Sequence, residues 1–315
     1  PGRHAMIILI ALYTASVFSL NGLGEDMSVF RSPFTNIGKS TIISIRMKPE
    51  FTILNQGSDF RGIFWTHPFQ FSLTAPVGKG FAIGFGNLER FDQSFDVYFQ
   101  EDALNIYLDG DGGVDELYGC VAKVFPAGEV ALRGSYLFGN AAEIWQYTMS
   151  GYQLIDTFDY SYEGKVLNIG LRVMFFSASF ELGDMTVETP STDTSITLPS
   201  RLSLGLTHDM FGGRANLVFE RSFWPEHDDY QDCNRLKLGF FKKRTGISYH
   251  FNPWYMRGIT EHGITFDYHL PLMRGAGTVA LQLECLLRHK DDLYEWSISP
   301  GIRLTIRELF ARRRK

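Results

Sequence analysis

Residues 264–270 read ITFDYHL, with apolar side chains at every second position and Thr, Asp and His between them. After the turn PLMRGAG (271–277), residues 279–287 read VALQLECLL and keep the alternation except at Leu286, and residues 302–307 read IRLTIR. Successive side chains of a β-strand point to opposite faces, so this period of two predicts strands, and the turn between them predicts an antiparallel hairpin. One face of the hairpin is apolar, and the other is charged.

The same pattern recurs along the chain from about residue 40 onward. Residues 69–74 (FQFSLT) and 81–86 (FAIGFG) alternate on either side of a turn, and residues 167–173 and 202–207 alternate in the same way. We count about 12 to 14 such strands, many near ten residues long, which is the length that crosses a bilayer at a tilt. The fold class is therefore predicted to be all-β, a transmembrane antiparallel β-barrel of about 14 strands. Alternation does not say which face is wet, so a soluble periplasmic β-sandwich remains the alternative.

The composition agrees with strands that have one lipid-facing and one lumen-facing side. Aromatic residues make up 15% of the 315 residues and charged residues 21%, while the mean hydropathy is close to neutral at -0.08. A net charge of -5 argues against a nucleic-acid partner, which needs a basic surface. The three cysteines are far apart in the sequence, so they indicate neither a zinc site nor a disulfide framework.

The N-terminus carries the one long apolar run, and it divides the chain into three parts. Residues 6–20 read MIILIALYTASVFSL after Arg3 and His4, which is typical of a secretory signal peptide and short for a spanning helix. We expect a signal peptide at 1–21, a short hatch or plug segment at 22–39, and the barrel at 40–315. The plug segment is expected inside the lumen because it is Gly-rich and does not alternate. Its candidate ligand contacts are Phe30, Phe34 and Ile37.

Charged residues recur on the face that we predict to line the lumen. They are Arg133, Arg172, Glu220, Asp267, Glu284, Arg288, Arg303 and Arg307, together with Arg46 and Lys237. One interpretation is a network of salt bridges that makes the barrel rigid. The other is a pore lining that sets selectivity.

Other segments bear on chemistry and on the position of the membrane. Residues 109–116 read DGDGGVDE, which offers either a calcium loop or a plain Gly/Asp turn, without the flanking helices of an EF-hand. No zinc-protease or nucleophile-elbow motif is present, so we expect neither an enzyme, nor a metal site, nor a cofactor. Residues 108–116, 183–197 and 224–232 are expected as long polar loops. Tryptophans near strand ends, such as Trp224, Trp254 and Trp296, are expected in aromatic girdles.

Some residues resemble a known family. The segment SPFTNIG (32–38), after GLG (22–24), resembles the NPA segment that follows the hatch of the FadL/TodX superfamily of outer-membrane hydrophobic-compound transporters. The C-terminal third resembles FadL-like barrels, including relatives of the PorV/PorQ group, in the stretches YHFNPWY (249–255), TEHGITF (260–266), LPL (270–272) and RELF (307–310). The resemblance implies a barrel of about 14 strands, no cofactor, and passive movement of an apolar molecule.

The hypothesis for function is a channel or carrier for hydrophobic, fatty-acid-like small molecules in the outer membrane of a Gram-negative-type bacterium. Its partners would be membrane lipid and a hydrophobic ligand, and no chemical step is needed. The alternative is a non-transporting barrel that serves as a partner platform for a secretion or surface-attachment system, as a resemblance to PorV/PorQ implies. An apolar pocket from the surface to the hatch would favour transport, and a lumen filled by salt bridges would favour the platform.

Overall fold

The computed structural model describes Ser16, Phe18, Leu23 and residues 25–34, 41–56, 59–66, 69–101, 104–189, 193–225, 230–272 and 276–308. Ile37 and most of the predicted signal peptide lie outside these residues. The strands are β1 (Glu25–Asp26), β2 (Thr41–Met47), β3 (Pro49–Gln56), β4 (Asp59–Thr66), β5 (Gln70–Gly78), β6 (Phe81–Asp92), β7 (Phe95–Glu101), β8 (Leu104–Phe125), β9 (Gly128–Met149), β10 (Tyr152–Val173), β11 (Phe176–Glu188), β12 (Asp193–Thr197), β13 (Ser200–Met210), β14 (Gly213–Phe223), β15 (Cys233–Lys242), β16 (Thr245–Pro253), β17 (Thr260–Pro271), β18 (Gly277–Lys290) and β19 (Leu293–Glu308).

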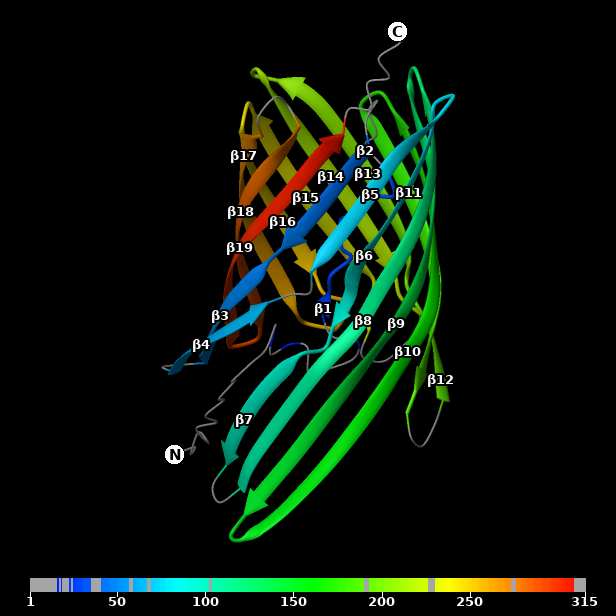
Figure 1. The fold of residues 1–315 in the computed structure, drawn as a ribbon. Coiled ribbons are helices and arrows are strands. Elements are labelled where there is room, and N and C mark those ends of the chain that lie inside the picture. Colours follow the sequence, from blue (N-terminus) through cyan, green and yellow to red (C-terminus); the bar gives the residue numbers. More distant parts are fainter. Residues whose placement is uncertain are drawn as a thin grey trace.

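Within the described residues, 14 antiparallel strands close into one barrel (Figure 1). The order around the ring is β2, β5, β6, β8, β9, β10, β11, β13, β14, β15, β16, β17, β18, β19 and back to β2. The last strand meets the first through pairs such as Arg303 with Arg46. The prediction of an all-β barrel is confirmed, and a two-sheet sandwich is wrong, because a closed ring leaves no second sheet to pack against.

The outer wall of the barrel is apolar. On β10, Leu167 and Ile169 expose 45% and 51% of their surface, whereas Asn168 between them is buried at 7%. Exposed apolar side chains alternate in this way on strand after strand, and the buried positions between them include charged residues such as Glu116, Arg235 and Arg288. A water-soluble protein would bury the apolar set instead, so this wall is built to face lipid. No helix among the described residues is long and apolar enough to span a bilayer.

We expect the substitution Ile169→Arg to lower the free energy of unfolding by about 2 to 4 kcal/mol in a lipid bilayer, because a charge would enter the hydrocarbon. The matched control is Thr157→Arg, which adds the same side chain to an exposed position of the same strand beyond the apolar belt. Urea titration of both variants in phospholipid vesicles measures the difference. Equal stability of the two variants would show that the apolar wall is not in lipid.

The two ends of the barrel differ. One end, the turn rim, carries two-residue turns such as 79–80, 126–127 and 174–175, whereas the other end has the longer link 254–259 besides the two-residue turns 150–151 and 291–292. The opposite end, the extended rim, is drawn out on one side because β8, β9 and β10 are 22 residues long and project beyond the other strands together with β7 (Figure 1). We call this projecting sheet the extension.

Two of the three segments expected as loops are mostly strand. Residues 108–116 lie inside β8, and residues 183–197 continue β11 and then form β12. Where strands extend beyond the membrane, their outer face is exposed to water and can be polar. Their composition then resembles that of a loop. The calcium-loop interpretation of residues 109–116 is therefore wrong. Gly112, at a φ of 113°, has the carbonyl oxygen of Asn140 2.2 Å from the position of an added Cβ, which explains a glycine there.

Candidate functional site

The described part of the N-terminal segment threads the barrel from the extended rim towards the turn rim. The backbone N–H of Leu23 donates to the hydroxyl of Tyr255 at 2.7 Å, and the N–H of Phe30 donates to the carboxylate of Glu220 at 3.0 Å. Between these two points β1 pairs with the end of β6. We refer to residues 23–34 as the plug segment.

The plug segment also packs against the wall at its far end. An added Cβ on Gly170 would lie 2.6 Å from the Pro33 ring and 2.9 Å from the Phe34 ring. Only a glycine allows this approach, and the guanidinium of Arg172 lies 5.1 Å from the centroid of the Phe34 ring. Of the predicted ligand contacts, Phe30 and Phe34 therefore touch the wall from inside.

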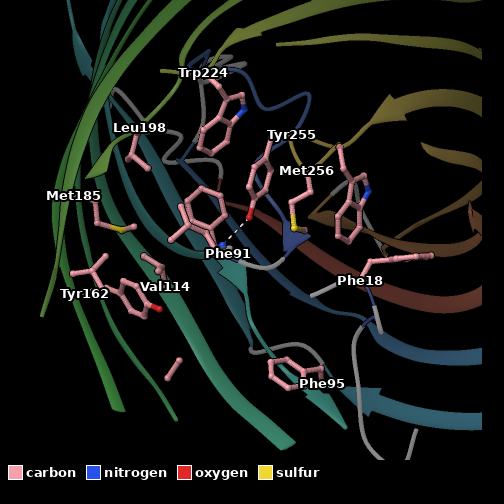
Figure 2. Packing of buried hydrophobic residues seen from close by; sticks show 14 of the residues in the cluster. Phe18, Phe91, Phe95, Val114, Tyr162, Met185, Leu198, Trp224, Tyr255 and Met256 are labelled. Carbon is pink, nitrogen blue, oxygen red and sulfur yellow. Dashed lines mark hydrogen bonds between the residues drawn. The ribbon is translucent and has the colours of Figure 1, made fainter. Parts of the chain in front are cut away.

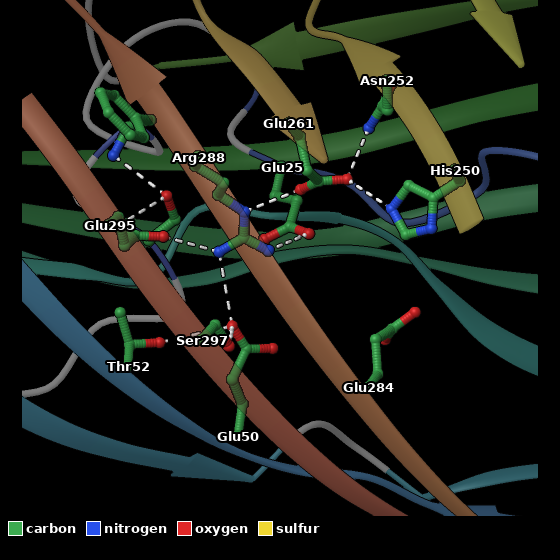
Figure 3. A network of polar contacts seen from close by, with 12 residues as sticks. Glu25, Glu50, Thr52, His250, Asn252, Glu261, Glu284, Arg288, Glu295 and Ser297 are labelled. Atoms are coloured by element: carbon green, nitrogen blue, oxygen red, sulfur yellow. Dashed lines mark hydrogen bonds and ion pairs between the residues drawn. The ribbon is translucent and has the colours of Figure 1, made fainter. Parts of the chain in front are cut away.

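Arg288 on β18 is the centre of the main polar network (Figure 3). Its guanidinium is fully buried and meets four carboxylates, with N···O distances of 2.7 Å to Glu25, Glu261 and Glu295 and 3.4 Å to Glu50. Glu25 belongs to the plug segment, and the other three come from the wall. One side chain therefore ties β3, β17 and β19 to the plug.

Lys48 lies 4.0 Å from Glu50, but two cations do not balance four carboxylates, and neutral donors supply further hydrogen bonds. The hydroxyl of Ser297 donates to Glu50 at 2.5 Å, and the side-chain amide of Asn252 donates to Glu261 at 2.9 Å. His250 is 3.2 Å from Glu261. Buried carboxylates are tolerated only when such partners satisfy their oxygens, so the network depends on complete assembly.

A second anchor holds Asp26 of the plug segment. Its carboxylate pairs with Arg201 and lies 3.8 Å from Arg235, which itself pairs with Glu220 at 2.9 Å. The hydroxyl of Ser28 donates to Asp26 at 2.6 Å. Consecutive plug residues, Glu25 and Asp26, thus reach arginines on different strands of the wall, Arg288 on β18 and Arg201 on β13.

Three of the predicted lumen residues form ion pairs outside the two anchors described above. Arg133 pairs with Glu116 at 2.5 Å, Arg172 with Glu129, and Glu284 with Lys48 at 2.7 Å. Glu220 and Arg288 belong to the two anchors above. Asp267 is buried, Arg303 lines a cavity, and Arg307 is exposed on the turn rim, where its backbone N–H donates to Ala276 at 2.7 Å.

A cavity of about 310 Å³ lies between the plug segment and the wall. Its lining includes Phe30, Arg31, Arg46, Lys237, Glu284 and Arg303. Most of these side chains are charged, so the chamber suits water and polar groups better than a hydrocarbon. A larger hollow of about 920 Å³ is open to the outside and lies on the lipid-facing wall around Gly119 and Gly134, so lipid chains would fill it.

An apolar cluster fills the lumen at the extended rim (Figure 2). Trp224 stacks on Tyr255 with ring centroids 4.3 Å apart, and Tyr230 meets Tyr255 edge-on at 5.0 Å. Trp254 is also buried there, so Trp224 and Trp254 are not girdle residues, and that expectation is wrong for both. Trp296, at 52% exposure, does face outward. The sequence signal that could have predicted this cluster is the presence of aromatic residues in the non-alternating segments that link strands.

The cluster continues onto the extension. Phe95, Val97 and Leu108 are buried members, and the partly buried Trp145 and Tyr160 pack against them. Beyond them, Phe158 packs on Trp145 with centroids 5.6 Å apart. The inner face of the extension therefore carries apolar side chains that continue into the mouth of the lumen, with Glu143 and Asp156 beside Trp145.

No protein-family model matches the chain, and no curated protein matches it by sequence. Several solved structures match almost its whole length. A FadL homologue of Pseudomonas aeruginosa is 9% identical with a TM-score of 0.54, covering 96% of this chain and 98% of its own. The toluene transporter TodX of Pseudomonas putida is 10% identical with a TM-score of 0.53, covering 87% and 90%. This chain has the FadL-like barrel fold.

A third match extends the comparison. The monoaromatic hydrocarbon channel CymD is 10% identical with a TM-score of 0.52, covering 91% of this chain and 95% of its own. CymD is named as a channel and TodX as a transporter, neither as an enzyme, in line with the sequence-based expectation. At such identities the comparison establishes the fold, and the cargo has to be argued from the residues.

Proposed function

We propose that this FadL-like barrel is a passive carrier for hydrophobic small molecules across a bacterial outer membrane. The apolar outer wall supports a membrane location, and similar solved barrels carry names of hydrocarbon channels and transporters. In such barrels the short turns face the periplasm, so the extended rim would face outside. The predicted signal peptide at 1–21 would direct the chain there.

The run of apolar side chains at the extended rim is the observation that carries this proposal. A hydrophobic molecule would first meet the inner face of the extension, around Trp145 and Phe158. It would then reach the aromatic cluster around Tyr255, which contacts the plug segment at Leu23. Apolar contact along this approach keeps the molecule out of water before it reaches the barrier.

The plug segment would be that barrier, in keeping with the sequence-based prediction of a hatch at 22–39. Two clusters of ion pairs fix it, at Glu25 and at Asp26. Passage would require the plug to shift within the lumen. The charged chamber beside it would stay hydrated and would give the shifted plug residues polar partners.

Uptake by whole cells tests the proposal. We expect cells that make the wild-type barrel to accumulate radiolabelled toluene or oleate faster than cells without it. The double substitution Trp145→Asp with Tyr160→Asp should lower this uptake by about tenfold, because charge on the apolar path costs more than the 1.4 kcal/mol that a factor of ten represents. The matched control is Thr157→Asp, on the polar face of the same sheet.

Immunoblots of outer-membrane fractions must show equal amounts of each variant. Uptake that is equal with and without the barrel would sink the proposal. An equal loss of uptake in the double variant and in Thr157→Asp would show that the molecule does not follow the apolar path. Passage of toluene alone or of oleate alone would define the cargo class.

A partner platform remains the second candidate, and the charged interior favours it. The described lumen is crossed by ion pairs around Arg288 and Arg201, and its chamber is polar. A platform needs such rigidity and no moving plug. The same assay separates the two functions, because a platform predicts no uptake of either probe.

A further inference from the structure

The extension has an open edge. Strand β10 pairs with β9 from Tyr152 onward, but its pairing with β11 begins only at Ser161. On the side away from β9, residues 152–160 therefore have no strand partner within the described residues. Backbone N–H and C=O groups along such an edge are available to pair with another strand.

The usual protections of an open edge are missing here. Natural proteins cover edge strands, shorten them, or place lysine or proline on them. Residues 152–160 read YQLIDTFDY, with no proline and no lysine. Tyr152, Leu154 and Ile155 expose 80%, 58% and 54% of their surface. Asp156 and Asp159 are the only charged residues on this edge, and we expect a partner that complements them.

The charge of the extension indicates the chemistry that a partner would need. Its two sequence segments, 95–111 and 140–163, contain no Lys, Arg or His, although the whole chain has 30 Lys and Arg. Their acidic residues are Asp96, Glu101, Asp102, Asp109, Asp111, Glu143, Asp156, Asp159 and Glu163. Asp156 and Asp159 lie on the edge strand itself, one on each face.

We propose that the free edge of β10 binds an extended strand of a partner protein in which basic and apolar residues alternate. Backbone hydrogen bonds would add that strand to the sheet beside β10, as in other cases of strand addition. Asp159 lies on one face of β10, and Leu154 and Phe158 lie on the other with Asp156 between them. The basic residues would therefore face Asp159, the apolar ones would cover Leu154 and Phe158, and Asp156 would add to the negative charge of the edge. A second copy of this chain is disfavoured, because pairing β10 with itself would bring two acidic strands together.

Binding of synthetic peptides to the purified barrel in non-ionic detergent tests the proposal. The probe is a fluorescein-labelled nine-residue peptide of alternating Lys and Val, and the comparison peptide has Glu in place of Lys. Fluorescence anisotropy should show about tenfold or greater preference for the Lys peptide, because like charges across the edge oppose pairing. The double substitution Asp156→Lys with Asp159→Lys should weaken Lys-peptide binding about tenfold. The control Asp209→Lys, on the turn rim, should leave it unchanged.

A third peptide separates strand pairing from simple attraction of charges. It keeps the Lys–Val sequence but carries N-methyl groups on alternate residues of the edge that would pair, which removes hydrogen-bond donors. We expect its binding to be lost. Binding equal to that of the unmethylated peptide would overturn strand addition, as would failure of the Lys peptide to bind. A wild-type dimer that the double substitution dissociates, measured by ultracentrifugation, would assign the edge to a second copy instead.

Discussion

The substitution Arg288→Met is expected to lower the free energy of unfolding by about 3 to 5 kcal/mol, the range for removing one partner of a buried ion pair. The methionine would fill most of the volume of Arg288 but would leave Glu25, Glu50, Glu261 and Glu295 without their shared cation. Four buried carboxylates would then repel one another in a medium that screens charge poorly. The strands β3, β17 and β19 and the plug segment would lose their common tie.

Urea titration of the folded barrel in detergent, followed by its heat-modifiable migration on gels, measures this loss. The matched control is Arg214→Met, which breaks an exposed pair with Asp209 at 3.0 Å and should cost less than about 1 kcal/mol. Arg288→Lys should fall between the two, because an ammonium keeps the charge but lacks the planar fork. If Arg288→Met and Arg214→Met had the same free energy of unfolding, the ion pairs of Arg288 would not stabilise the barrel.

Replacing residues 25–34 by a Gly/Ser linker of equal length should open the barrel to ions. The linker removes Glu25 and Asp26, so both anchors to the wall are lost, and it removes Phe30 and Phe34 from the lumen. Planar-bilayer recordings should show steady conductance in this variant and only a small baseline in the wild type. The expected difference is about tenfold or more, since a chain that fills the lumen excludes water and ions.

The opened pore should prefer anions. Arg46, Lys237 and Arg303 line the chamber, and Arg201 and Arg235 would lose the carboxylate of Asp26. A reversal potential measured across a potassium chloride gradient gives the preference. The control is Phe211→Ser on a turn of the turn rim, which should stay closed. A linker variant that conducts no better than this control would show that the plug segment does not block the lumen.

The barrel could be predicted from the sequence because the alternation of apolar and polar residues is a local pattern. Alternation at 264–270 and 279–287, with a turn between them, needs no knowledge of distant residues, and the strand count followed from repeating that step. The extension and strand β12 could not be predicted, because the polar strand residues at 108–116 and 183–197 have the composition of loops. The aromatic cluster was also missed, since Trp224 and Trp254 sit in linking segments where alternation gives no direction.

By itself, the sequence determined that this chain forms strands with one apolar and one charged face, because successive side chains of a strand point in opposite directions. The tertiary structure alone decided which charges meet. Arg288 is separated by 263 residues from Glu25 and by 238 from Glu50, yet it contacts both. Such contacts depend on how the ring closes and on where the plug enters, and both are set by packing across the lumen rather than by any stretch of sequence.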